Sequence, residues 1–299
     1  MRTLVVGATG LLGGAIARKL LATGVTVRVL GRNRTKLAAL AELGAETVSC
    51  DLLDAAGVAR ACEGVDQICT TANNVMGRGA SSPNRVDIPA HVNLCAAATH
   101  AGVCRLLYVS AYETGGADSP VDFFRVKDRI ETIVKGCGIP WVMLRPTAFM
   151  DVWVPMIAGD IQRKGVAMIF GDGKRLANFI AVEDVAEIAV RILTNESIQN
   201  ETIDIGGPAN ISLEQLVVAV ERELGVSARR RHMPAGVLRF MSVALRPFHE
   251  VASRMMSLGY FMAARDTSFA DWRASADRFD VTLMTLEAFV TASFRRPKA

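Results

Sequence analysis

The sequence predicts an α/β fold with a doubly wound parallel sheet and a smaller, mainly helical lobe towards the C-terminus. Short runs rich in β-branched residues alternate with segments of helical periodicity over the first half of the chain. A glycine-rich turn separates the first run from the first helical segment. The 299 residues, 51% of them hydrophobic, are enough to bury a large core. This rhythm is typical of βαβ units with right-handed crossovers.

The first strand is expected at Arg2–Val6, a short apolar run. It leads directly into Gly7-Ala8-Thr9-Gly10-Leu11-Leu12-Gly13, after which apolar residues recur with helical spacing. Gly7 permits a sharp turn, Gly10 keeps side chains away from a ligand, and Gly13 lets the helix approach the strand. Free N–H groups and the positive end of the helix dipole favour an anion there. The segment therefore predicts a cradle for the pyrophosphate of a dinucleotide.

The next elements continue the alternation up to residue 144. Strands are expected at 25–30, 46–49, 67–71, 105–109 and 141–144, and helices at 34–43, 55–62, 87–101 and 120–135. The last of these helices has an N-terminal signal, with Ser119 as N-cap and Pro120 as its first residue. In such a sheet ligands bind beyond the C-terminal ends of the strands, between the first and the fourth.

After Pro146 the rhythm loosens. Helices are expected at 182–193 and 212–224, the second capped by Ser212 and ended by Gly225, with a strand at 202–205. Residues 234–265 are apolar, rich in Met and broken by Pro247, which predicts helices that form a pocket wall. We therefore expect a dinucleotide-binding core at 1–155 and a substrate-covering lobe at 156–299, with about 182–206 returning to the core.

Composition narrows the class of protein. The net charge of +4 is concentrated after residue 225, where Arg229-Arg230-Arg231 is expected on a solvated surface because no aromatic platform for nucleic acid surrounds it. The six cysteines form no CxxC pair, which favours free, mostly buried thiols and a cytoplasmic location. The N-terminus is not typical of a signal peptide, and no apolar run is long enough to span a membrane. The histidines show no ligand spacing, so no metal site is expected.

The end of the second strand indicates which dinucleotide binds. NAD sites usually carry Asp or Glu there, for the ribose 2′-hydroxyl. This chain instead has Leu30-Gly31-Arg32-Asn33-Arg34-Thr35-Lys36, without an acid. Arg32 can meet a 2′-phosphate with its guanidinium fork, and Arg34 or Lys36 can add a second contact. We expect NADP(H) to be preferred, with NAD(H) as the alternative.

Two further segments follow strands at the same edge. Asp51-Leu52 follows the third strand, where the carboxylate can accept from the adenine amino group. Thr71-Ala72-Asn73 follows the fourth strand, near the expected pyrophosphate and ribose. Both segments are candidate cofactor contacts by position.

Several motifs in order give the chain a more specific resemblance. They are Gly7 to Gly13, Gly31-Arg32, Asp51-Leu52, Tyr108-Val109-Ser110-Ala111, Phe123-Phe124-Arg125-Val126-Lys127 with Glu131, Leu144-Arg145-Pro146-Thr147-Ala148-Phe149, Phe179 to Ala186 and Gly206-Gly207-Pro208. In these the chain resembles the atypical short-chain dehydrogenase/reductase superfamily, and within it the NmrA-like NAD(P)-binding group. The resemblance implies a Rossmann core that binds NAD(P), with a C-terminal region over the substrate. It covers about residues 1–224.

The resemblance also defines a departure. Reductases of this superfamily carry a Ser and a Tyr-x-x-x-Lys helix, in which Tyr gives its proton to the carbonyl oxygen and Lys holds the nicotinamide ribose and lowers the Tyr pKa. Four residues before Lys127 this chain has Phe123, which cannot donate a proton. The NmrA-like group includes both redox sensors without turnover and reductases that use another donor. Both remain open for this chain.

Three residues are candidates for the catalytic site. Ser110 follows the fifth strand and can hydrogen-bond a substrate oxygen, and the Tyr112 phenol is a possible replacement donor. Lys127 can polarise the carbonyl, relay a proton, or only anchor the ribose. Backbone groups of Pro146 and Thr147 are expected near the nicotinamide carboxamide.

The substrate is expected to be large and apolar. Candidate contacts are Tyr112, Phe123, Phe149, Met150 and Trp153, with further apolar candidates at Met156, Met241, Met255, Met256, Tyr260, Phe261 and Met262. Three functions follow from these residues. The first is an NADPH-dependent reductase acting on a carbonyl or activated double bond of an aromatic ketone, quinone or polyketide-like compound. The second is a non-catalytic NADP(H) sensor that binds a protein partner. The third is a peripheral scaffold or assembly protein that docks through 236–262 on a membrane or a complex.

Overall fold

The computed structural model describes residues 1–295 of the chain, so the last four residues of the predicted lobe lie outside the described part. The chain divides into two compact units. The first unit comprises residues 1–145 and 185–204, and the second comprises 146–184 and 205–299. The chain crosses from one unit to the other more than once, and each unit has its own hydrophobic core.

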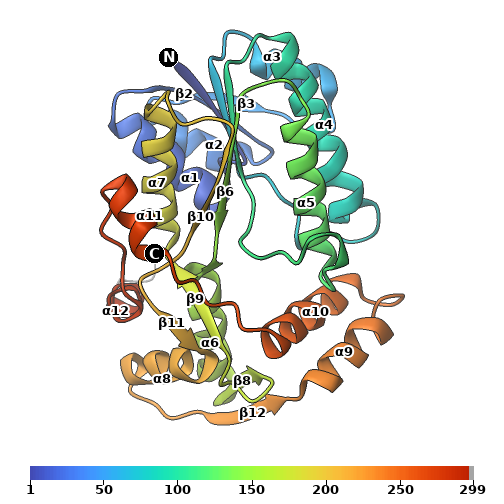
Figure 1. Cartoon of the computed structure of the whole chain (residues 1–299), viewed down its shortest axis with the longest axis vertical. Coiled ribbons are helices and arrows are strands. Elements are labelled where there is room, and N and C mark those ends of the chain that lie inside the picture. Colours follow the sequence, from blue (N-terminus) through green and yellow to red (C-terminus); the bar gives the residue numbers. More distant parts are fainter. Residues whose placement is uncertain (296–299) are drawn as a thin grey trace. The chain divides into compact units, whose positions relative to one another are not determined.

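A seven-stranded sheet forms the centre of the first unit (Figure 1). Its strands in order across the sheet are β10 (Glu201–Ile205), β6 (Trp141–Pro146), β5 (Arg105–Val109), β4 (Gln67–Thr70), β1 (Arg2–Val6), β2 (Thr26–Gly31) and β3 (Glu46–Ser49). The neighbours from β6 to β3 pair in parallel. The predicted doubly wound α/β fold is confirmed, with the change of strand order between β1 and β4.

Helices cover both faces of this sheet (Figure 1). One face carries α1 (Leu11–Ala22), α2 (Arg34–Ala41) and most of α7 (Val182–Thr194), and the other carries α3 (Ala55–Cys62), α4 (Pro83–His100) and α5 (Asp122–Lys135). The strands are apolar on both faces, as Leu4, Val5 and Val6 of β1 are all fully buried. Because parallel strands end at one edge, the loops after β1 to β6 all emerge on the same side.

Two helix starts differ from the expectation. Helix α5 begins at Asp122 with Val121 as its N-cap, so Ser119 does not cap it. The Ser119 hydroxyl instead accepts a hydrogen bond of 3.3 Å from the Val121 backbone N–H, which makes a local turn ahead of the helix. Helix α4 begins four residues earlier than expected, at Pro83, because proline is well suited to the first helical position.

The second unit combines helices with two small sheets. Its elements are β7 (Ala148–Phe149), α6 (Met150–Lys164), β8 (Val166–Phe170), β9 (Leu176–Ile180), β11 (Asn210–Ser212), α8 (Leu213–Leu224), β12 (Arg229–Met233), α9 (Ala235–Ala244), α10 (Glu250–Ala264), α11 (Trp272–Phe279) and α12 (Leu286–Arg295). One sheet has the order β11-β9-β7 and the other pairs β12 with β8. Helix α8 has the predicted Ser212 cap, completed by Gln215 as a capping box, and ends at Gly225 in the left-handed region.

The basic run at 229–231 is not solvated along its whole length, in contrast to the expectation. It lies in β12, where alternate side chains point to opposite sides. The Arg230 guanidinium is bound by Glu214 at 2.8 Å and by both Glu221 oxygens, at 2.5 and 2.9 Å. The prediction of a solvated surface is therefore wrong for Arg230, while Arg229 and Arg231 are exposed as expected.

The six cysteines are free thiols, as predicted. Cys62, Cys69 and Cys95 are buried, whereas Cys104 is exposed, so burial does not extend to all of them. Burial raises the pKa of the Cys69 thiol to about 12. Among residues 1–295 no helix is long and apolar enough to cross a membrane.

Candidate functional site

The turn after β1 is too tightly packed for any side chain at two of its glycines. Gly7 has φ +83, in the region that favours glycine, and its N–H donates to the Leu30 carbonyl at 3.1 Å. A Cβ at Gly13 would lie 2.4 Å from the Gly7 carbonyl oxygen and 2.7 Å from the Thr71 hydroxyl. Helix α1 therefore lies directly against the end of β1, in the arrangement expected for a phosphate cradle.

The N-terminus of α1 is open to an anion. Gly10 is the N-cap, it is exposed, and no side chain caps the first turn, which also lacks an acidic residue. Leu11 is 63% exposed while Leu12 and Gly13 are buried, so the apolar side of the helix faces the core. The N–H groups of a first helical turn have no intrahelical acceptor. Together with the helix dipole they favour a bound phosphate group.

A second close approach joins the glycine turn to the end of β2. A Cβ at Gly31 would lie 2.7 Å from the Thr9 methyl carbon, so Thr9 and Gly31 are in contact. Lys36 on α2 donates to the Thr9 carbonyl oxygen at 3.3 Å. Arg32 is exposed and its guanidinium lies 3.8 Å from the Asp51 carboxylate. The structure thus brings Lys36 to the glycine turn and Arg32 to Asp51, while Arg34 is exposed on the first turn of α2.

The Asp51 and Thr71 segments lie at the same edge of the sheet. Asp51 accepts a hydrogen bond of 3.0 Å from the Leu53 N–H, which fixes the turn after β3, and Leu52 is half-buried. The Thr71 hydroxyl donates to the Val6 carbonyl oxygen at 3.3 Å and packs beneath the glycine turn. Ala72 is half-buried, and Asn73 is exposed and donates to the Thr71 carbonyl oxygen at 3.2 Å.

Lys127 is the most unusual group at this edge. Its side chain projects from α5 and is 4% exposed. Nζ donates to the Val109 carbonyl oxygen at 2.7 Å and lies 4.9 Å from the centre of the Tyr108 ring and 5.6 Å from that of Phe123. Burial lowers the pKa of Lys127 to about 8, although Asp87 and Glu131 oppose the shift. A lysine of this kind exchanges its proton near neutral pH.

Ser110 follows Val109 at the end of β5 and is also buried. Its hydroxyl makes no hydrogen bond within residues 1–295. The hydroxyl is near enough to the Glu131 carboxyl to help lower the pKa of that group, but the two do not meet in hydrogen-bond geometry. Ser110 is therefore a buried donor at the same edge as Lys127, as expected for a residue that contacts a ligand oxygen.

Tyr112 lies in the loop after β5, as predicted. It is half-buried, and its hydroxyl donates to the neighbouring Glu113 carboxylate at 3.3 Å. Glu113 has φ +44, which marks a tight turn at this point of the loop. The phenol is thus held by a carboxylate beside it, an arrangement that does not activate it as an acid.

A buried polar cluster beside Lys127 was not predicted from the sequence. Burial lowers the pKa of His91 on α4 to about 4. Its Nδ1 lies 2.7 Å from the Asp87 carbonyl oxygen, and Nε2 lies 3.4 Å from the Thr70 hydroxyl. The ring also packs edge-on against Tyr108, whose hydroxyl is buried without a partner in the described residues. The expected helix at 87–101 already puts Asp87 one turn before His91, but nothing in the sequence indicates that Tyr108 packs beside them.

An ion pair joins the next turn of α5 to β6. Arg145 binds both carboxylate oxygens of Glu131, through Nε at 2.8 Å and Nη2 at 2.5 Å. Burial is the largest influence on the pKa of Glu131 and would raise it, but the hydrogen bonds from Arg145, the nearby Ser110 hydroxyl and the charges of Arg145 and Lys135 together lower it. Glu131 lies one turn after Lys127, so this bidentate pair fixes the helix that carries the lysine.

Pro146 and Thr147 have few hydrogen-bonding groups left for a ligand. Pro146 has no N–H, and the Thr147 N–H already donates to the Ile205 carbonyl oxygen at 3.0 Å. The Thr147 hydroxyl donates to Asn178 at 2.8 Å, and both residues are buried. Carbonyl oxygens are therefore the backbone groups that this segment can still offer.

The predicted substrate residues of the second unit lie mostly in its core. Met150 is 2% and Trp153 is 7% exposed, and the Trp153 ring packs edge-on against Phe170 and Phe179. Core packing therefore accounts for both residues without a ligand. Phe149 is half-buried at the end of β7, and the Met156 side chain is 43% exposed on α6.

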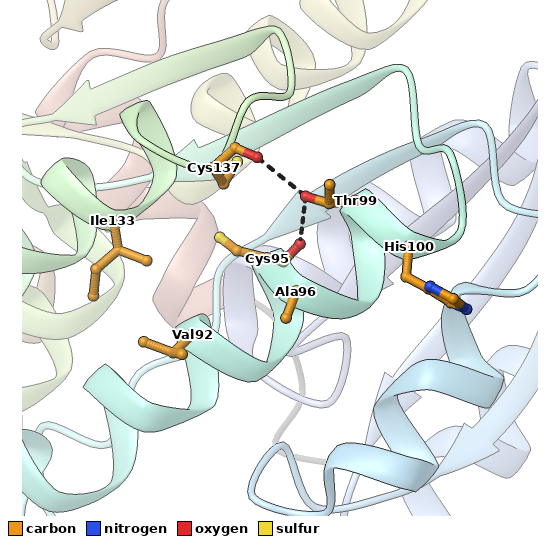
Figure 2. Close-up of a pocket in the computed structure, with 7 residues that line it drawn as sticks. All are labelled: Val92, Cys95, Ala96, Thr99, His100, Ile133 and Cys137. Carbon is orange, nitrogen blue, oxygen red and sulfur yellow. Dashed lines mark hydrogen bonds between the residues drawn. The ribbon is translucent and has the colours of Figure 1, made fainter.

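A pocket of about 490 Å³ lies elsewhere on the first unit, between α4 and the end of α5. Figure 2 shows its lining, which is Val92, Cys95, Ala96, Thr99, His100, Ile133 and Cys137. The Thr99 hydroxyl lies 2.9 Å from the Cys95 carbonyl oxygen and 3.1 Å from that of Cys137, which ties the two helices together. None of the predicted site residues lines this pocket. Helix α4 ends at this pocket, just before β5 begins. The pocket therefore lies towards the edge of the sheet at which β5 starts, opposite the edge that carries the candidate site. Within residues 1–295 no group of three or more metal-ligating side chains occurs.

Comparison with known proteins bears on the family and the fold of the chain. The model of the NmrA-like family matches residues 1–290. The photosystem II assembly factor Ycf39 of Synechocystis sp. is 27% identical, over 99% of this chain and 91% of its own. An NAD(P)H azoreductase of Xenophilus azovorans is 30% identical, over 76% of this chain and 75% of its own.

A solved structure extends the comparison to three dimensions. The NADPH-dependent quinone oxidoreductase of Escherichia coli, solved with NADPH, superimposes with a TM-score of 0.80 at 22% identity, over 99% of this chain and all of its own. The resemblance drawn from the sequence is thereby confirmed, and the fold is that of NAD(P)-binding proteins. Homologues and structural neighbours include NAD(P)H-dependent oxidoreductases, with NADPH as the cofactor of the solved neighbour.

Proposed function

The chain belongs to the NmrA-like family, and from this premise we propose that it is an NADPH-dependent reductase of a hydrophobic small molecule. The group reduced is a carbonyl or an activated double bond, in an aromatic ketone, a quinone or a polyketide-like compound. The observation that carries the proposal is a buried amine, Lys127, at the same sheet edge as the Gly7–Gly13 turn.

The residues at this edge fit NADPH. The turn leaves no room for a Cβ at Gly13, and Gly10 exposes the start of α1, so backbone N–H groups can receive the pyrophosphate. Arg32 is the proposed contact for the 2′-phosphate, with Lys36 and Arg34 beside it. NADPH held there would supply a hydride from C4 of its nicotinamide ring.

We assign the proton to Lys127. With a pKa of about 8, its ammonium form dominates at neutral pH, and one of its three N–H groups is used by Val109. The other two can hydrogen-bond the substrate oxygen, stabilise the charge that develops there, and deliver a proton. Ser110 donates a second hydrogen bond to that oxygen. The added hydride and proton together convert a carbonyl into an alcohol.

Two aromatic side chains at the start of α5 support an apolar substrate. Phe123 and Phe124 lie on the first turn with their ring centres 6.0 Å apart, and both are half-buried. Two relatives are named for conjugated acceptors, as an azoreductase and a quinone oxidoreductase. Flat, electron-poor substrates of this kind suit aromatic side chains. Tyr112 and Phe149 are proposed as additional contacts.

One observation favours a second function. Phe123 stands where a phenol would be expected, so the chain lacks the usual acid one turn before Lys127. A protein that binds NADP(H) without turnover, and passes its redox state to a protein partner, needs no such acid. The relative named as a photosystem II assembly factor supports a role of this kind.

Turnover separates the two functions. The purified chain is mixed with NADPH and a panel of quinones and aromatic ketones, and loss of NADPH is followed. A reductase oxidises NADPH in a substrate-dependent manner, and NADH is used less well. Tight NADPH binding without oxidation across the panel contradicts the reductase and supports the sensor, whose partner is then sought with the oxidised and reduced cofactor.

A further inference from the structure

Helices α9 and α10 form a hairpin within the second unit (Figure 1). Leu238 is the one buried residue of α9, and it packs where Gly259 of α10 leaves room, since a Cβ there would lie 3.1 Å from the leucine methyl. The Ser253 hydroxyl of α10 donates to the Ser242 carbonyl oxygen at 2.5 Å. One side of α9 is thus fixed to α10, and its other side faces outwards.

The outward side of this hairpin is unusually apolar. Val237, Phe240 and Val243 lie on it at helical spacing and are 46%, 70% and 69% exposed. Phe248, in the turn before α10, is 86% exposed. Phe248, Phe240 and Val243 are the three most exposed large apolar side chains of the described chain. We call these four residues the hairpin face. Such a cluster marks an interaction surface more often than a single exposed residue does.

The charge of residues 224–249 has one sign, and the next residue, the half-buried Glu250, begins α10. From residue 224 to residue 249 the sequence contains five arginines and no aspartate or glutamate. Arg230 is held by Glu214 and Glu221, but the other four are exposed and form no ion pair within residues 1–295. These four are Arg229, Arg231, Arg239 and Arg246. Arg239 is on α9 itself, with its guanidinium 5.9 Å from the centre of the Tyr260 ring.

We propose that the hairpin face docks on an anionic lipid surface. Phe240, Phe248 and the valines enter the boundary between headgroups and acyl chains, and the arginines meet lipid phosphates. Exposed aromatic residues beside unpaired arginines are typical of helices that lie in a membrane interface. Attachment is peripheral, since no helix of residues 1–295 can span a bilayer. This proposal does not depend on the reductase.

A second copy of the chain fits the same surface less well. A symmetric dimer brings the same patch together twice, so the arginines of one copy would face the patch that carries Arg239 and Arg246 in the other. No acidic residue between positions 224 and 249 is available to pair with them. Like charges at an interface oppose association. The charge of the patch therefore favours an anionic partner over a copy of itself.

Vesicle flotation with the full chain tests the proposal. Vesicles are made of phosphatidylcholine alone, or of phosphatidylcholine with phosphatidylglycerol. We expect binding to the anionic vesicles at low salt, weaker binding to the neutral ones, and loss of binding as salt rises. Phe240→Ser with Phe248→Ser should weaken binding by roughly tenfold or more, because the transfer of two phenylalanines from water is lost. Arg239→Gln with Arg246→Gln should remove the preference for anionic vesicles.

Two exposed residues outside the hairpin face serve as controls. Val218→Ser on α8 removes an apolar side chain that is 49% exposed, and Arg163→Gln on α6 removes a charge that is 71% exposed. Both should bind vesicles like the unchanged chain, and all variants should unfold at the same temperature. Absent binding to anionic vesicles at low salt overturns the proposal. So does an oligomer that is lost in the Phe240→Ser, Phe248→Ser variant without any vesicle binding, which would assign the face to a second copy. Unchanged vesicle binding in the Phe240→Ser, Phe248→Ser variant would also overturn it.

Discussion

The Lys127 ammonium nitrogen lies 5.6 Å from the centre of the Phe123 ring, one helical turn away. The lysine therefore faces an aromatic ring at the place where a phenol would otherwise complete a proton-transfer pair. Its hydrogen bond goes instead to the Val109 carbonyl oxygen, at 2.7 Å. Because Phe123 cannot donate a proton, the acid that we assign to the reaction is the Lys127 ammonium group.

Phe123→Tyr tests this arrangement. The new hydroxyl would extend from a ring already positioned beside Lys127, and a phenol near an ammonium group is a better acid than one in water. We expect the turnover number to rise by up to about tenfold, within the range of general acid catalysis. Phe124→Tyr, on the neighbouring residue, is the control and should change turnover little. Equal rates for Phe123→Tyr and the unchanged chain would mean that proton transfer does not limit the reaction.

Arg32→Ala tests the cofactor preference. A charge-assisted contact contributes roughly 1.5–3 kcal/mol, so the dissociation constant for NADPH should rise about 10- to 100-fold. The constant for NADH should stay the same, because NADH lacks the 2′-phosphate. Isothermal titration with both cofactors measures the difference, with Arg163→Ala as the control for loss of an exposed arginine. Equal affinities for the two cofactors in the unchanged chain would refute the assignment.

Gly13→Ala tests the packing of the glycine turn. Its Cβ would lie 2.4 Å from the Gly7 carbonyl oxygen, so the backbone has to move. We expect the free energy of unfolding to fall by about 1–3 kcal/mol, the usual cost of overpacking, and NADPH to stop raising the unfolding temperature. Gly236→Ala is the matched control, since a Cβ there meets nothing within 4 Å. Retained stability and NADPH response in Gly13→Ala would contradict the tight contact.

His91 should make stability depend on pH. Its pKa falls to about 4 in the folded chain, below the usual 6.5, so the unfolded chain binds the proton more readily. Stability is therefore lost as pH falls from about 6.5 to about 4, by up to roughly 1.4 kcal/mol per pH unit. Urea unfolding at several pH values measures the slope, and His91→Gln should flatten it. The same slope in both proteins would show that another group is responsible.

Most of the first unit could be predicted from the sequence because local signals agree with its fold. The strand before Gly7 and the helix after Gly10 show clear periodicity. In the second unit the same holds for α8, whose two ends are marked by Ser212 and Gly225. Ser119 was misleading, since serine and proline also make the turn that precedes α5. In the second unit, α6 and the short strands β8 and β9 were not predicted. These elements are stabilised by packing around Trp153, which leaves no local signal in the sequence.

The site could be predicted only in part. Residues that follow strands were placed correctly at one edge, because parallel strands end together. The contact between His91 on α4 and Tyr108 on β5 joins segments separated in the sequence, and one sequence carries no signal for such a contact. The burial of Lys127, which lowers its pKa to about 8, is a property of the packed fold in the same way.

The role of Lys127 is tested most directly by the pH dependence of turnover at saturating NADPH, compared with Lys127→Met. We predict that the turnover number of the unchanged chain is steady below about pH 8 and declines above it, as the ammonium group loses its proton. Lys127→Met should lose roughly 10²- to 10⁴-fold in turnover while it still binds NADPH. If Lys127→Met turns over as fast as the unchanged chain across this pH range, the central claim is contradicted.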